Sequence, residues 1–181
     1  KVLEVTEPEP HEVIAKEAAY LITNMMEDVV QRGTGQAAKV LGRPIAGKTG
    51  TTNDYINAWF IGGTPNLVCG VYVGFDDRRS LGESETGARS ALPIWITFMK
   101  EALKQLPVVP FEIPDGVTFV KVDSSTGLLE SEQEGEGQKG TVELFTKGSE
   151  PTQAVQRRQD PMDFYKMDKI PEGPPAGDGN L

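Results

Sequence analysis

Two apolar stretches joined by a three-residue turn constrain the fold of this chain more than any other feature. The stretches are residues 58–63 and 67–75, and the link between them is Thr64-Pro65-Asn66. Proline fixes one backbone dihedral angle and asparagine tolerates a tight bend, so the two stretches are predicted to be antiparallel strands. The second stretch is apolar at both alternating sets of positions, which predicts an interior strand covered by helices on both sides.

Two amphipathic helices are predicted on either side of these strands. Apolar residues follow helical spacing within residues 12–32, where Gly33 ends the pattern, and again from Pro93 to residue 103. A further strand is predicted at 45–52. The order of helix, three strands and helix predicts an α/β fold in which an antiparallel sheet is flanked by helices.

The rest of the chain has a different composition. Residues 107–181 contain 14 acidic and 7 basic residues of a chain whose net charge is −9, and three prolines follow residue 106 closely. One strand is predicted at 117–123, whereas 131–140 is rich in Glu, Gln and Gly and 171–181 in Pro and Gly. We therefore expect residues 1–106 to form part of one domain and 107–181 to form a linker, a short β segment and a loose acidic tail. The negative charge argues against nucleic acid as a partner.

The sequence also predicts the environment of a few single residues. Cys69 is alone, so it can form neither an internal disulfide nor a cysteine metal cluster, and it is predicted to be a small core residue. We assign no metal site and no cofactor. Trp59 and Trp95 are predicted to pack in the core. Tyr55 and Asn57 could border a cleft, and the sequence leaves that open.

Residues 42–49 match the phosphate-binding pattern G-x-x-x-x-G-K-T, and the apolar stretch that ends at Asp76 is similar to a magnesium-binding strand. A phosphate-binding loop needs a buried strand before Gly42 and a helix that begins near Gly47. Residues 37–41 are too short for that strand, and residues 50–54 are poor helix formers. Both flanks therefore argue against a P-loop NTPase, which is kept as a remote alternative.

The second interpretation places Lys48-Thr49-Gly50-Thr51 on an edge strand beside a cleft, where it resembles the Lys-Thr-Gly element of penicillin-binding proteins and class A β-lactamases. In acyl transfer from a peptide with a free carboxylate, Lys48 would supply positive charge and Thr49 and Thr51 would donate hydroxyl hydrogen bonds. Gly50 would let the substrate backbone approach, and the Thr51 amide would face the oxyanion. Lys48 and Thr51 are thus the candidate catalytic residues, and all four residues are candidates for substrate binding. Because Lys-Thr-Gly recurs by chance in many proteins, the tripeptide alone does not identify this family.

The neighbouring sequence makes the resemblance specific. The relevant segments, in order, are Asp28-Val29-Val30-Gln31-Arg32-Gly33-Thr34-Gly35, Ala46-Gly47-Lys48-Thr49-Gly50-Thr51-Thr52-Asn53-Asp54, Ala58-Trp59-Phe60-Ile61-Gly62-Gly63-Thr64-Pro65, Gly70-Val71-Tyr72-Val73-Gly74-Phe75-Asp76 and Ala91-Leu92-Pro93-Ile94-Trp95. Together they resemble the transpeptidase domain of bifunctional class A penicillin-binding proteins, most closely the 1A type of Gram-negative bacteria. The resemblance implies a partial penicillin-binding protein/serine β-lactamase-like fold. It also implies a serine D,D-transpeptidase that crosslinks peptidoglycan stem peptides ending in D-Ala-D-Ala and is acylated by β-lactam antibiotics.

The chain departs from that family in what it lacks. No serine is followed by lysine at the spacing Ser-x-x-Lys, and no Ser-x-Asn occurs. The resemblance therefore implies that an N-terminal remainder of the same enzyme supplies the nucleophile, a glycosyltransferase domain and a membrane anchor at the periplasmic face of the bacterial inner membrane. We expect the chain to be soluble, inactive and unstable by itself. The alternative is a noncatalytic module that binds peptidoglycan peptides or partner proteins.

Overall fold

The computed structural model describes residues 11–130 and 140–155. These residues fall into two compact units, one of residues 11–119 with 144–150 and one of residues 120–130 with 140–143 and 151–155. The predicted stretch 171–181 and nearly all of 131–140 lie outside the described residues. The predicted domain boundary between residues 106 and 107 stays a prediction.

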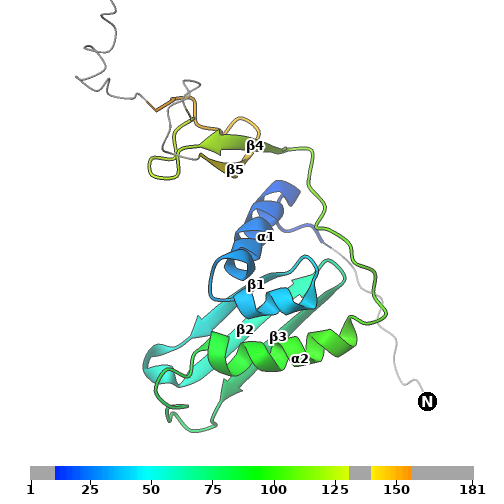
Figure 1. Cartoon of the computed structure of the whole chain (residues 1–181), viewed down its shortest axis with the longest axis vertical. Coiled ribbons are helices and arrows are strands. Elements are labelled where there is room, and N and C mark those ends of the chain that lie inside the picture. The colour runs from blue at the N-terminus through cyan, green and yellow to red at the C-terminus, as the bar shows by residue number, and fades with distance from the viewer. Residues whose placement is uncertain (1–10, 131–139, 156–181) are drawn as a thin grey trace, which may run out of the picture. The chain divides into compact units, whose positions relative to one another are not determined.

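The first unit contains a three-stranded antiparallel sheet in the order β1-β2-β3 (Figure 1). The strands are β1 (Ala46–Thr51), β2 (Asn57–Thr64) and β3 (Leu67–Gly74). The short 3₁₀ turn η2 (Asn53–Tyr55) links β1 to β2. Thr64 pairs with Leu67 at the end of the β2–β3 hairpin, which confirms the predicted turn and both strands.

Besides η2, four helical segments of the described residues accompany the sheet: α1 (Lys16–Gln31), the 3₁₀ helix η1 (Gln36–Leu41), the π-helical turn η3 (Gly87–Ala91) and α2 (Leu92–Ala102). Figure 1 shows α2 lying across the sheet. Both predicted helices are present, and Pro93 lies in the first turn of α2 as expected. However, α1 begins four residues later than predicted, and Ile22 and Met25 of its predicted apolar face are exposed. Val30, near its end, is the α1 residue that enters the core.

The core lies where α1, η1 and α2 meet the Phe60 face of the sheet. The Phe60 and Trp95 rings are in edge contact, with centroids 4.9 Å apart. The indole Nε1–H of Trp95 donates a hydrogen bond of 3.0 Å to the Cys69 carbonyl, which ties α2 to β3. Cys69 is half-buried and packs against this cluster, where burial raises the pKa of its thiol. The prediction that Trp95 packs in the core is confirmed.

Replacing Trp95 with Phe should lower the free energy of unfolding by about 1–3 kcal/mol, because the Cys69 carbonyl loses its buried donor and part of the ring volume is lost. The matched change Trp59→Phe is expected to cost much less, since Trp59 is exposed. Midpoints of thermal unfolding for the two variants would check this. Equal losses of unfolding free energy in the two variants would mean that the Trp95 hydrogen bond adds little to stability.

The other face of the sheet carries large exposed side chains: Trp59, Ile61, Val68 and Tyr72. Trp59 is 41% exposed and contacts the Tyr72 ring, with centroids 4.8 Å apart. The prediction that Trp59 packs in the core is therefore wrong. The expectation that β3 is an interior strand covered on both sides is also wrong. β3 is an edge strand of this sheet, and the core cluster covers only the face that carries Cys69 and Val71.

Two short strands lie farther along the chain, β4 (Val117–Val122) and β5 (Thr141–Thr146), and they form a two-stranded sheet. β4 was predicted and β5 was not.

After β4, the Asp123 carboxylate accepts hydrogen bonds from the backbone and hydroxyl groups of Ser125 and Thr126. The Ser125 and Thr126 hydroxyls, followed by the backbone donors, lower the Asp123 pKa to about 2. In the described part of the chain, no helix has the length and apolar character needed to cross a membrane.

Candidate functional site

The four candidate residues Lys48 to Thr51 occupy the second half of β1, at one edge of the three-stranded sheet. Among the described strands, β1 pairs with β2 alone, so its outer edge is free of strand pairing, while α1 packs close to β1. Lys48 and Thr49 lie within the strand and the following turn is a three-residue 3₁₀ segment, so no helix begins near Gly47. The site therefore lacks the helix N-terminus that a phosphate-binding loop requires.

The side chains of β1 alternate between the two faces of the sheet. Thr49 lies opposite Phe60 and Thr51 opposite Ala58, so both hydroxyl-bearing side chains share the face of the buried core residues. Lys48 lies opposite Ile61, on the exposed face. The Lys48 ammonium is exposed and donates a hydrogen bond of 2.7 Å to the Thr49 carbonyl. Lysine and hydroxyls therefore flank the same free strand edge from two sides.

The backbone of β1 offers donors at its outer edge. The Thr52 amide donates to the Asn57 carbonyl across the β1–β2 pair, at 3.0 Å. Consecutive residues of an antiparallel strand direct their amides to opposite edges, so the Thr51 amide points away from β2. Such an outward amide can bind a substrate backbone or a developing oxyanion.

Two segments distant in sequence touch the hydroxyls of β1. The Thr34 hydroxyl, in the turn after α1, lies 2.7 Å from the Thr49 hydroxyl. The Gly87 amide, at the start of η3, donates to the Thr51 hydroxyl at 3.0 Å. Sequence reasoning assigned no role to either residue. For Thr34 the available signal was its place in one of the segments that carry the family resemblance, and for Gly87 it was only a Thr-Gly pair in a predicted loop.

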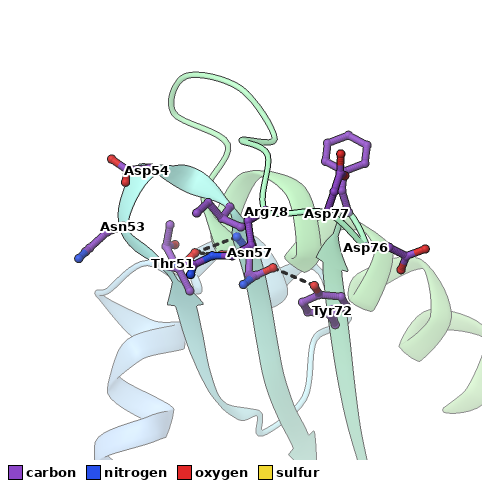
Figure 2. A pocket seen from close by; sticks show the side chains of 11 residues that line it. Thr51, Asn53, Asp54, Asn57, Tyr72, Asp76, Asp77 and Arg78 are labelled. Atoms are coloured by element: carbon purple, nitrogen blue, oxygen red, sulfur yellow. Dashed lines mark hydrogen bonds between the residues drawn. The ribbon is translucent and has the colours of Figure 1, made fainter.

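A mainly polar pocket of about 730 Å³ opens beyond Thr51, at the ends of β1 and β3 (Figure 2). Its lining includes Thr51, two residues of the η2 turn, Asn53 and Asp54, and residues that follow β3, among them Asp76, Asp77 and Arg78. Asn57 and Tyr72 also line it, and the Tyr72 hydroxyl donates to the Asn57 side-chain oxygen at 2.8 Å. The pocket places charged side chains of both signs next to the candidate strand.

The η2 turn at this pocket has an unusual backbone. Asp54 and Tyr55 both have positive φ angles, 60° and 53°, a region that residues other than glycine seldom adopt. The Tyr55 carbonyl accepts a hydrogen bond from the Leu81 amide at 2.8 Å, which holds the turn against the loop after β3. Of the two residues whose place was left open, Asn57 lines the pocket and Tyr55 does not.

Comparisons with known proteins agree with one another. The family model described as "Penicillin binding protein transpeptidase domain" matches residues 4–97. Penicillin-binding protein 1A of Rickettsia conorii is 44% identical over 128 residues, which are 71% of this chain and 16% of that protein. The protein of the same name from Aquifex aeolicus is 41% identical over 151 residues, 83% of this chain and 20% of that protein.

A solved structure is similar as well. The crystal structure of Penicillin-Binding Protein 1A from Haemophilus influenzae matches with a TM-score of 0.72 and 38% sequence identity, over 80% of this chain and 22% of that chain. The chain thus spans about a sixth to a fifth of the length of these relatives.

Proposed function

The chain belongs to the penicillin-binding protein transpeptidase family, and we propose that it forms one wall of the active site of a serine D,D-transpeptidase. The family match and the solved relative confirm the predicted fold class and the resemblance to the 1A type. The proposed reaction is acyl transfer from peptidoglycan stem peptides that end in D-Ala-D-Ala. β-Lactam antibiotics, which also carry a carboxylate beside a reactive carbonyl, would acylate the same enzyme.

One observation carries this proposal: the Lys48 ammonium, the Thr49 and Thr51 hydroxyls and the outward Thr51 amide all flank the free edge of β1. An extended peptide can lie along such an edge. The hydroxyls of Thr49 and Thr51 would donate to its terminal carboxylate, and Lys48 would add positive charge. Gly50 keeps the exposed face of the strand bare, because the Cβ of any other residue there would lie 3.2 Å from the Trp59 Cβ.

The chemistry of the acyl step needs groups that this wall does not contain. The attacking serine and its base would come from an N-terminal remainder of the same enzyme, because the printed sequence has no Ser-x-x-Lys and no Ser-x-Asn. When the serine attacks the carbonyl, negative charge develops on the carbonyl oxygen. The Thr51 amide would stabilise that charge, and Lys48 would assist proton transfer on the other side of the strand.

The remaining parts of the proposal concern the complete protein. Its partners would be peptidoglycan stem peptides and β-lactams, with no nucleic acid and no cofactor. An N-terminal anchor would hold it at the periplasmic face of the bacterial inner membrane, and a glycosyltransferase domain would precede the transpeptidase. The support for these parts is the similarity to proteins named penicillin-binding protein 1A.

The test is covalent labelling of the complete protein that contains this chain. A fluorescent penicillin should form a stable adduct that unlabelled penicillin prevents, and a synthetic stem peptide ending in D-Ala-D-Ala should release D-alanine. A complete protein that binds stem peptides, takes up no label and releases no D-alanine would instead be the noncatalytic binding module.

A further inference from the structure

The two hydroxyls of β1 are each held by a group from another part of the chain. Thr49 contacts the Thr34 hydroxyl, and Thr51 contacts the Gly87 amide. Neither contact follows from the strand itself, since Thr34 and Thr49 are 15 residues apart and Gly87 and Thr51 are 36 apart. Their effect on the two hydroxyl protons can be worked out from donor and acceptor chemistry.

The Thr51 contact has a fixed direction. An amide N–H can only donate, so the Thr51 oxygen accepts and its own proton remains available. Within residues 11–130 and 140–155, that proton meets no acceptor. Because Thr51 is also exposed, its hydroxyl can donate to a ligand at the strand edge.

The Thr34–Thr49 contact can run in either direction, because both partners are hydroxyls. If Thr49 donates its proton to a carboxylate, Thr34 must donate to Thr49. The result is a chain of two hydrogen bonds that ends on the anion, and each bond polarises and strengthens the next. Binding of an anion would therefore select the direction in which Thr34 is the donor.

The turn that carries Thr34 is fixed by the end of α1. The amides of Gly33 and Gly35, on either side of Thr34, both donate to the Val29 carbonyl, at 3.1 and 2.9 Å. A Cβ atom on Gly33 or Gly35 would lie 2.9 Å or 3.2 Å from backbone atoms of Val29, so the turn is closely packed on the helix. Thr34 itself is exposed, so its main interaction is the contact of its hydroxyl with Thr49.

We propose that Thr34 is a positioning residue, which orients the Thr49 hydroxyl so that its proton points at the carboxylate of the substrate or β-lactam. This inference rests on the proposed function, because it takes the carboxylate as the ligand of Thr49. It adds a residue outside the strand to the recognition of that carboxylate. The Gly87 amide, by donating to the Thr51 oxygen, leaves the Thr51 proton available to the same carboxylate.

The test is a double-mutant cycle in the complete transpeptidase, read as the second-order rate constant of acylation by a fluorescent penicillin. Thr34→Val removes the hydroxyl and keeps the branched shape, and should lower that constant about tenfold. In a Thr49→Val background the same change should have almost no further effect, because Thr34 acts through Thr49. Thr34→Ser should restore the wild-type constant.

The outcomes separate this inference from the function on which it rests. A wild-type protein that penicillin does not acylate would refute the proposed function itself. Normal acylation of the wild type together with an unchanged Thr34→Val variant would refute the role of Thr34 alone. So would a loss that is equal in both backgrounds, or one that serine does not rescue, because either would indicate general damage to the turn.

Discussion

A fluorescent penicillin is expected to leave no covalent label on the 181-residue chain when the chain is incubated by itself. The reason is chemical: no Ser-x-x-Lys occurs in it, and loss of the attacking residue in serine hydrolases lowers turnover on the order of 10⁶-fold. Gel fluorescence after denaturation would measure the adduct.

The control for this experiment is the complete protein at the same molar concentration, which should be labelled within the same time. Specific labelling of the isolated chain, prevented by unlabelled penicillin, would contradict the expectation. It would mean that one of the chain's own side chains is the nucleophile, and that the division of the active site between two parts of the enzyme is incorrect.

Replacing Lys48 with Ala in the complete protein should lower the rate constant of penicillin acylation by about 10²–10³-fold, comparable to the loss of one oxyanion donor. The ammonium is the one positive charge among the four candidate residues of β1, so its removal would take away the proposed attraction for the carboxylate and the proposed participant in proton transfer. Stopped-flow or gel-based time courses would give the rate constant.

Lys39→Ala is the matched control, because Lys39 is also an exposed lysine but lies in η1 instead of on the strand. It should leave acylation within about twofold of the wild type, as is usual for surface changes away from a site. A Lys48→Ala variant that behaves like Lys39→Ala would remove Lys48 from the catalytic residues and leave it as a surface lysine.

The parts of the fold that local chemistry determines could be predicted. The Thr64-Pro65-Asn66 turn and its flanking strands depend on backbone preferences of adjacent residues, and the hairpin was found where it was expected. Helix α2 follows from a proline at its start and one apolar face. The η3 turn just before it was missed, because its Gly-Ala-Arg-Ser-Ala sequence has no helical signature.

Predictions that depended on what covers a surface were less successful. Trp59 was expected in the core, yet it neighbours Phe60 on β2, and neighbouring strand residues point to opposite faces. Once Phe60 faces the core, Trp59 must face away from it. Similarly, the apolar character of β3 shows that its residues tolerate burial, but not which segments bury them.

The candidate site was predictable in part for the same reason. Lys48 to Thr51 form a contiguous stretch, so their placement on one strand follows from the sequence, and their roles stay a proposal. The contacts of Thr34 and Gly87 with that strand join residues far apart in the chain, and no periodicity reports such contacts. The pocket beyond Thr51 likewise combines η2 with the residues after β3.

The opposite placement of the two tryptophans has an optical consequence. Trp95 is fully buried and Trp59 is 41% exposed, and they are the chain's two indole chromophores. Indole emission moves to longer wavelength in water, and aqueous quenchers reach exposed rings alone, so the two side chains give separable fluorescence signals. Trp95 reports on the integrity of the core. Trp59 reports on whether the outer face of the sheet is covered.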